Sequence, residues 1–122
     1  MTRLAACQYA IELIETWEDY AKHLAAIVAK AKAKGAELLL LPEYSAMALT
    51  GQLPPDVRSD LHGSIEAMQS LIPSWVELCE ELAREHRVLF QPGSAPVKDA
   101  DGKFRNRAWL FGPEGLIGFQ DK

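Results

Sequence analysis

The stretch Ala36-Glu37-Leu38-Leu39-Leu40-Leu41-Pro42-Glu43 decides how the rest of this chain is interpreted. Four consecutive leucines are typical of a strand that is buried on both faces, as in a mostly parallel sheet. Pro42 cannot donate a hydrogen bond to a sheet ladder, so the strand is expected to end there. Glu43 would then lie at the carboxyl end of a buried strand, which is where α/β sheets bind their ligands.

Two interpretations of Glu43 follow from this position. A carboxylate beside so much apolar surface should have its charged form disfavoured, which suits a general base that works near neutral pH. A solvated glutamate at the start of a loop is equally compatible with the pattern. The position alone leaves both interpretations open.

The composition of the 122 residues is that of one modest globular domain or of part of a larger one. A net charge of −4 and an isoelectric point of about 5.3 give no reason to expect a nucleic-acid partner. No segment approaches the roughly 20 apolar residues of a membrane span, and the amino terminus does not have the form of a signal peptide. We therefore expect a cytoplasmic protein that does not associate with membranes.

Cysteine and histidine are too scattered to predict a disulfide framework or a metal site. Cys7 and Cys79 lie far apart, and neither has a histidine or cysteine at metal-binding spacing. Cys7 falls inside the first predicted strand and Cys79 on the apolar stripe of a helix, where a free cysteine behaves as a small hydrophobic residue. We expect neither thiol to be a catalytic nucleophile and no bound metal. The histidines His23, His62 and His86 form no cluster along the chain.

The residues before the leucine run predict a βαβ unit. Residues 4–9 indicate a short interior strand. Thr16 with Asp19 three residues later has the form of a helix cap, and Gly35 is a natural helix end. Apolar residues recur at helical spacing between these two signals: Trp17, Tyr20, Leu24, Ile27, Val28 and Ala31.

The residues after Glu43 predict a loop, two helices and further strands. Turn chemistry at 99–103 and 112–115 favours antiparallel hairpins. The predicted elements are a loop at 44–60, helices near 61–72 and 73–86, and strands at 88–91, 94–98, 104–111 and 116–122. This order predicts an α/β fold in which a mixed sheet carries helices on one face. The other face would have no cover in this chain, so a longer polypeptide or a partner chain is expected to supply it.

The order and spacing of these motifs resemble the amino-terminal part of the nitrilase, or carbon–nitrogen hydrolase, superfamily. The resemblance covers essentially all 122 residues. It rests on Leu4-Ala5-Ala6-Cys7-Gln8, the leucine run ending in Pro42-Glu43, Gly93-Ser94, Asn106-Arg107-Ala108, Gly112-Pro113-Glu114-Gly115 and the final Lys122. It implies an α-β-β-α sandwich, of which residues 1–122 would be the amino-terminal part of a single domain truncated after Lys122. Such proteins usually form homo-oligomers.

The resemblance also implies a chemistry for this chain. Members of the family hydrolyse small-molecule amides, nitriles or carbamoyl-amines with a catalytic Glu, Lys and Cys, through a thioester and without a cofactor. By this match Glu43 is the general base and Lys122 is the catalytic lysine. The nucleophilic cysteine follows that lysine in the family, so we expect the 122 residues to be inactive alone.

Two neighbouring residues and one alternative function complete the predictions. Tyr44 follows the base directly and could line the pocket, although aromatic packing fits equally well. Asn106 is expected to hydrogen-bond its own backbone at the start of a strand. The alternative function is a non-catalytic interaction module that pairs with a full-length partner.

Overall fold

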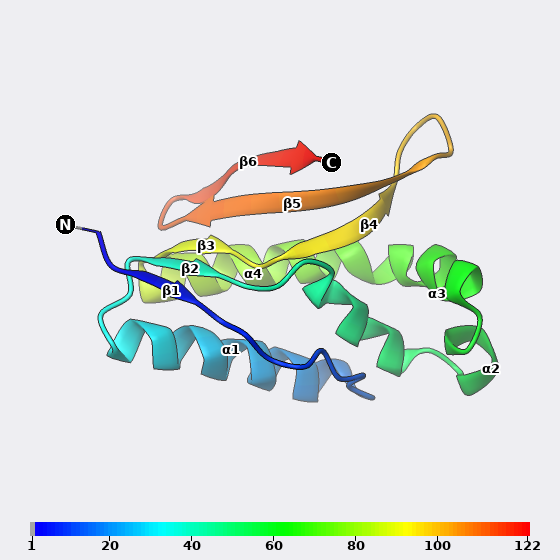
Figure 1. Ribbon diagram of the computed structural model, residues 1–122, viewed down its shortest axis with the longest axis horizontal. Helices are drawn as coiled ribbons and strands as arrows, with labels where there is room; N and C mark the ends of the chain where they lie inside the picture. The colour runs from blue at the N-terminus through cyan, green and yellow to red at the C-terminus, as the bar shows by residue number, and fades with distance from the viewer. Residues whose placement is uncertain (1) are drawn as a thin grey trace.

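The computed structural model describes residues 2–122 and confirms a mixed α/β fold (Figure 1). Within these residues six strands form one sheet, in the order β1-β2-β3-β5-β4, with β6 paired to β5. The strands are β1 (Leu4–Ala6), β2 (Leu38–Leu40), β3 (Leu89–Gln91), β4 (Ser94–Lys98), β5 (Phe104–Gly112) and β6 (Gly115–Asp121). The helices are α1 (Trp17–Ala33), η1 (Ser45–Gln52), α2 (Pro55–Arg58), α3 (Leu61–Met68), η2 (Gln69–Leu71) and α4 (Ile72–His86).

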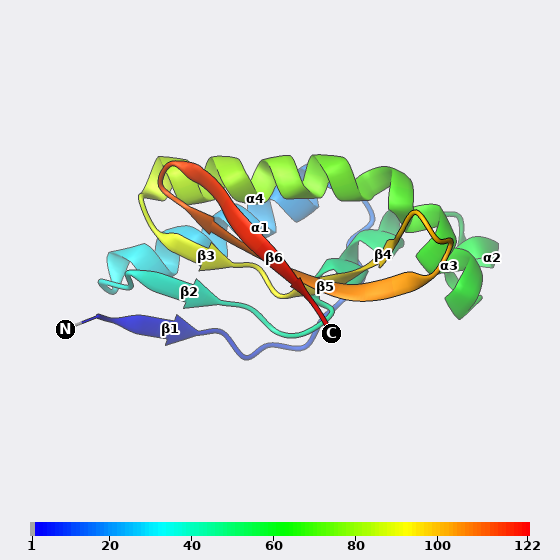
Figure 2. The same cartoon turned by 90° about the horizontal axis from the view of Figure 1, so that it is seen from above.

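The sheet combines a parallel half and an antiparallel half. Strands β1, β2 and β3 run parallel, with Leu39 opposite Phe90. Strand β5 runs antiparallel to β3, β4 and β6 and so connects the two halves. The carboxyl ends of β2 and β3 therefore lie at the same edge, near the carboxyl end of β6 (Figure 2).

Helix α1 forms as its end signals predict. Thr16 Oγ1 accepts a hydrogen bond from Asp19 N at 3.1 Å, which satisfies one free N–H of the first turn. Lys30 and Lys32 lie in the last turn, where they face the negative end of the helix dipole. The chain then leaves the helix through Gly35 at φ 86°. The predicted βαβ unit is confirmed.

The core lies between the sheet and the helices α1 and α4, which cover one face of it (Figures 1 and 2). Trp75 of α4 is fully buried, and its ring meets that of Trp109 edge-on at 5.2 Å between centroids. Its Nε1 donates to the hydroxyl of Tyr20 on α1 at 2.7 Å. This contact joins the two helices through their buried sides, and burial raises the pKa of Tyr20.

Two expectations about strand burial are wrong. The first strand is only three residues long and lies at the sheet edge, where the side chain of Leu4 is 58% exposed. In the leucine run Leu39 is fully buried, while Leu38 and Leu40 on the opposite face are only partly buried. The physical reason is the same in both cases. Helices cover one face of the sheet, so the other face keeps apolar side chains near solvent.

The expected long loop at 44–60 is also wrong, because most of it is helical. Residues Ser45–Gln52 form η1 and Pro55–Arg58 form α2. Gly51, Pro54 and Pro55 are residue types that favour loops, but Gly51 and Pro55 have other roles here. Pro55 occupies the first turn of α2. At Gly51 a Cβ atom would lie 2.5 Å from the backbone of Ile14, so the glycine allows a close approach of two chain segments.

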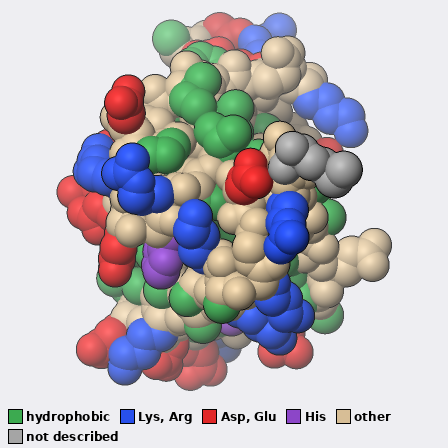
Figure 3. Space-filling view, turned by 90° about the vertical axis from the view of Figure 1, so that its left-hand side faces the viewer, with side chains coloured by type: hydrophobic (Ala, Val, Ile, Leu, Met, Phe, Trp, Pro, Cys, Tyr) green, Lys and Arg blue, Asp and Glu red, His purple; other side chains and the backbone are tan. Residues whose placement is uncertain are grey.

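Strand β6 carries exposed hydrophobic side chains. Leu116, Ile117 and Phe119 are between 47% and 60% exposed. Figure 3 views the molecule from the end that holds the β5–β6 turn, and hydrophobic side chains gather in the upper half of this view. None of the helices in residues 2–122 is long and apolar enough to cross a membrane.

Candidate active site

Glu43 lies at a junction where the ends of β2 and β3 are held together. Leu41 N donates to Gln91 O at 2.9 Å, which continues the pairing beyond β2. Tyr44 N donates to Ser94 Oγ at 2.8 Å, and the Ser45 hydroxyl donates to Pro92 O. Glu43 is therefore carried on a short segment that is bonded to the neighbouring strand on both of its sides.

The backbone at this junction requires two left-handed conformations. Tyr44 has φ 59°, which is unusual for a residue with a side chain and costs energy unless neighbours hold it. The hydrogen bond to Ser94 is one such restraint. Gly93 has φ 85°, and a Cβ atom there would collide with Pro42 O and Ser45 Oγ. The sharp turn after Glu43 thus depends on a glycine of the adjacent strand end.

Three residues from distant parts of the chain meet at this edge of the sheet. Lys122 Nζ lies 3.3 Å from Glu43 Oε1, although 79 positions separate the two residues in sequence. Asn106 Nδ2, from β5, donates to the same oxygen at 2.6 Å. The backbone connects the two donors as well, because Lys122 N donates to Asn106 O at 3.0 Å. The structure therefore brings together the glutamate and the lysine that the sequence predicted for the site.

The group lines an open cavity of about 490 Å³. The side chains of Glu43 and Lys122 are 53% and 79% exposed, so the expected apolar surroundings of Glu43 are not found in residues 2–122. An ion pair this exposed contributes only about 0–1 kcal/mol to folding. The ion pair therefore contributes little to the stability of the fold, so stability does not explain why the two charged groups lie together. The lining residues are Glu43, Gln91, Gly93, Ser94, Asn106, Ala108, Gln120, Asp121 and Lys122.

Asn106 is the site residue whose contact the sequence did not predict. It was expected to bond its own backbone, but its side chain reaches Glu43 across 63 residues of sequence. Its other amide atom, Oδ1, is buried and has no hydrogen-bond partner among the described residues. The Asn106-Arg107-Ala108 motif marked the position, but no local signal pointed to Glu43.

The remaining candidates lie away from this group. The Tyr44 side chain is 42% exposed and does not line the cavity, so its place in a pocket stays a prediction. Cys79 is fully buried in α4, and burial raises the pKa of its thiol well above the usual value. Cys7 follows β1, and burial raises its pKa as well. Neither cysteine lines the cavity of Glu43, and residues 2–122 contain no group of three possible metal ligands.

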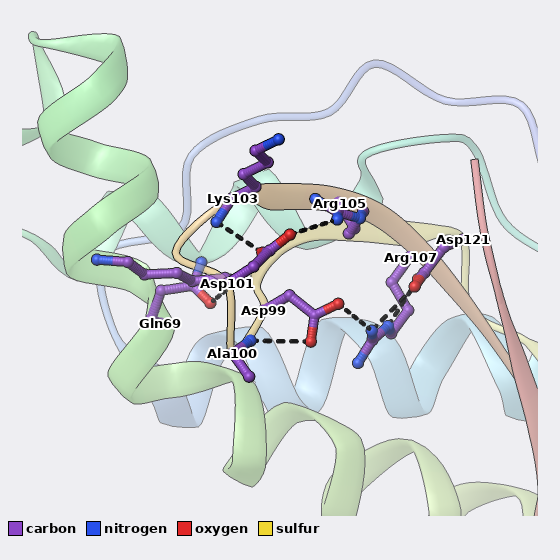
Figure 4. A network of polar contacts seen from close by, with 9 residues as sticks. Gln69, Asp99, Ala100, Asp101, Lys103, Arg105, Arg107 and Asp121 are labelled. Atoms are coloured by element: carbon purple, nitrogen blue, oxygen red, sulfur yellow. Dashed lines mark hydrogen bonds and ion pairs between the residues drawn. The ribbon is translucent and has the colours of Figure 1, made fainter.

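A polar network fixes the register of β5 and β6 next to the site (Figure 4). Arg107 binds Asp121 through two hydrogen bonds, of 2.7 and 3.0 Å, and lies 3.8 Å from Asp99. Its guanidinium also stacks on the ring of Phe119 at 4.1 Å. Arg107 and Asp121 are directly opposite in the ladder, one position from Asn106 and Lys122. The ion pair therefore helps to set which residue of β5 faces Lys122.

This pair predicts a loss of stability in acid. The hydrogen bonds from Arg107 hold the pKa of Asp121 below its usual value. A carboxyl whose pKa is lower in the folded state stabilises it fully above the unfolded pKa of about 3.9, and this stabilisation is lost as pH falls through the folded pKa. Asp121→Asn should therefore lose less stability between pH 6 and pH 3 than the unmodified chain, as measured by urea unfolding. Asp56→Asn, which alters an exposed carboxylate of α2, is the control and should leave the difference unchanged.

The family of the chain follows from a comparison with known proteins. The sequence profile described as carbon-nitrogen hydrolase matches residues 3–122. The chain therefore belongs to the carbon–nitrogen hydrolase family, as the sequence motifs predicted. No curated protein sequence matches it significantly.

Solved structures show the same fold over the whole chain. A carbon–nitrogen hydrolase from Helicobacter pylori superposes with a TM-score of 0.73 at 17% identity, covering 99% of this chain and 39% of its own. The NitFhit protein of C. elegans gives a TM-score of 0.71 at 19% identity over 100% of this chain and 29% of its own. An amidase from Nesterenkonia gives 0.63 at 19% identity, over 99% and 42%. The chain thus has the nitrilase fold and spans between about a quarter and a half of the length of these proteins.

Proposed function

We propose that this chain is the amino-terminal part of a hydrolase of non-peptide carbon–nitrogen bonds, with Glu43 as general base and Lys122 as the charge-stabilising lysine. The proposal rests on one observation in a member of this family. Lys122 Nζ and Glu43 Oε1, far apart in sequence, lie 3.3 Å apart on the wall of one cavity. A base and a cation on the wall of the same cavity can both reach one bound substrate.

The nucleophile is proposed to be a cysteine outside residues 1–122. A thiol is mostly protonated at neutral pH, so a carboxylate beside it is needed to produce the reactive thiolate. Cys7 and Cys79 do not line the cavity, and burial disfavours the thiolate of both. The Nesterenkonia amidase supports a thiol mechanism for the family, because a mutant of it carries acrylamide added at the active-site cysteine.

The proposed reaction moves one proton through Glu43 in each half. The carboxylate takes the thiol proton, and the thiolate attacks the carbonyl carbon of an amide. The ammonium of Lys122 stabilises the negative charge that develops on the carbonyl oxygen. Glu43 then gives its proton to the leaving amine, which departs and leaves a thioester. In the second half Glu43 deprotonates a water molecule, which attacks the thioester. The acid is released as the thiolate leaves, and Glu43 returns its proton to the thiolate, which restores the free thiol and the carboxylate.

The proposed substrates are small amides, with nitriles and carbamoyl-amines as related classes. A cavity of about 490 Å³ suits a small molecule. A mutant of the Nesterenkonia amidase has been crystallised with butyramide, which makes this compound a sensible first substrate. A cytoplasmic location and assembly into homo-oligomers remain predictions.

The test measures ammonia release from butyramide and acrylamide by the complete polypeptide that the gene encodes. We expect activity that Glu43→Gln and Lys122→Met abolish, because each removes one member of the pair. Glu37→Gln is a matched control, since Glu37 is an exposed glutamate just before the same strand. Full activity in Glu43→Gln would refute the proposed function.

A second measurement tests the source of the nucleophile. The 122-residue chain alone should release no ammonia. Release that depends on Glu43 would show that one of its own cysteines acts. A stop codon directly after Lys122 would instead favour the interaction module, whose contact surface would include the exposed side chains of Leu116, Ile117 and Phe119 on β6.

A further inference from the structure

We propose that Asn106 is a positioning residue that holds Glu43 by Oε1 and so leaves Oε2 as the oxygen that receives the nucleophile's proton. The inference rests on the proposed function and adds one residue and one atomic assignment to it. Two observations support it: both donors contact the same oxygen of Glu43, and the Asn106 amide turns its NH₂ group toward that oxygen.

The backbone of Asn106 is fixed by both neighbouring strands. It lies opposite Pro96 of β4 on one side, and its carbonyl accepts from Lys122 N on the other. A side chain that starts from such a restrained backbone loses little further freedom when it binds. Nδ2 lies 2.6 Å from Glu43 Oε1, a short distance that is typical of hydrogen bonds to a charged acceptor.

The orientation of the amide shows which partner determines it. An ionised carboxylate only accepts hydrogen bonds, so Asn106 must turn its NH₂ group toward Glu43. This leaves Oδ1 buried without a partner among residues 2–122, an arrangement that costs free energy. Among the described residues, the contact with Glu43 is therefore the one that orients the side-chain amide of Asn106.

The donors also distinguish the two oxygens of Glu43. Asn106 Nδ2 and Lys122 Nζ both contact Oε1, and no described residue donates to Oε2. If a proton were added to Oε1, it would compete with these two donors. If it is added to Oε2, Oε1 remains a carbonyl-type acceptor and both contacts persist. Oε2 can therefore take the thiol proton and return it to the leaving amine without disturbing the site.

Steady-state kinetics of the complete enzyme test the inference. Asn106→Ala should lower kcat by about 10-fold to 100-fold with little change in KM, the range expected for one hydrogen bond to a charged group. Asn106→Asp places a second carboxylate beside Glu43, so activity should be lower still at neutral pH and should partly recover in mild acid. Arg105→Gln is the control, because Arg105 lies on the same strand but pairs with Asp101.

A spectroscopic measurement separates positioning from a structural role. The side-chain NH₂ protons of Asn106 should resonate downfield in the complete enzyme and move upfield in Glu43→Gln. An unchanged kcat in Asn106→Ala, or an NH₂ signal that does not respond to Glu43→Gln, would overturn the inference. If Glu43→Gln loses activity while Asn106→Ala keeps it in full, the positioning role of Asn106 is refuted and the proposed function remains intact.

Discussion

Gly93→Ala is expected to destabilise the chain by about 2–5 kcal/mol and to displace Glu43. Two costs add together at this position. A residue with a Cβ atom pays about 1–2 kcal/mol for the left-handed backbone at φ 85°. The new methyl group would also collide with Pro42 O and Ser45 Oγ, and overpacking of this kind typically costs about 1–3 kcal/mol. Urea unfolding measures the sum.

Gly102 provides the control that separates the two costs. It has a similar φ of 79° in the β4–β5 turn, but a Cβ atom there would meet nothing within 4 Å. Gly102→Ala should therefore show only the conformational cost of about 1–2 kcal/mol. Equal destabilisation by the two variants would mean that the strand-end junction tolerates a methyl group. In the complete enzyme only Gly93→Ala should also reduce activity, because only it moves the segment that carries Glu43.

Trp75→Ala is expected to lower the free energy of unfolding by about 3–5 kcal/mol. The side chain is fully buried, contacts the ring of Trp109 and donates to Tyr20 OH, so its loss leaves a cavity and an unpaired hydroxyl. Unfolding should be followed by circular dichroism, since the substitution removes a fluorophore. The same change at Trp17, which is only partly buried at the start of α1, should cost clearly less.

Trp75→Phe removes the hydrogen bond and only part of the buried ring volume. The ring fills most of the same volume, but Tyr20 OH loses its donor between the two helices. We expect destabilisation of about 1–3 kcal/mol, the usual cost of leaving a buried polar group unpaired. A variant as stable as the unmodified chain would show that packing alone joins α1 and α4.

Local signals in the sequence predicted the elements whose causes are local. The Thr16 cap, the apolar stripe and Gly35 together define helix α1, and all three act within a few residues of the position they affect. Turn residues defined the β4–β5 hairpin for the same reason. The prediction of burial was wrong at Leu4 and in the leucine run. Burial there depends on what covers the far face of the sheet, and a local sequence pattern does not contain that information.

The candidate site was predictable only where a motif marked it. The Pro42-Glu43 strand end and Lys122 came from the family resemblance, and the structure places the two side chains together. The sequence did not predict the contact of Asn106 with Glu43, because the two residues are 63 positions apart. The contact also depends on how β5 aligns with its neighbours β3, β4 and β6, which no local pattern encodes. The left-handed backbone of Tyr44 could not be predicted from its neighbours in sequence, because the hydrogen bond that restrains it comes from Ser94, 50 residues away.

The wide sequence separation within the site has a consequence for the order of folding during synthesis. The βαβ unit and Glu43 leave the ribosome first, while Lys122 is translated 79 residues later and joins through β6. Because contacts between distant residues close slowly, the parallel strands should pair before the base meets its lysine. A nascent chain stalled before β6 should therefore hold Glu43 without its cation. The site would be the last part of this segment to assemble, and no partly made chain would carry a competent pair.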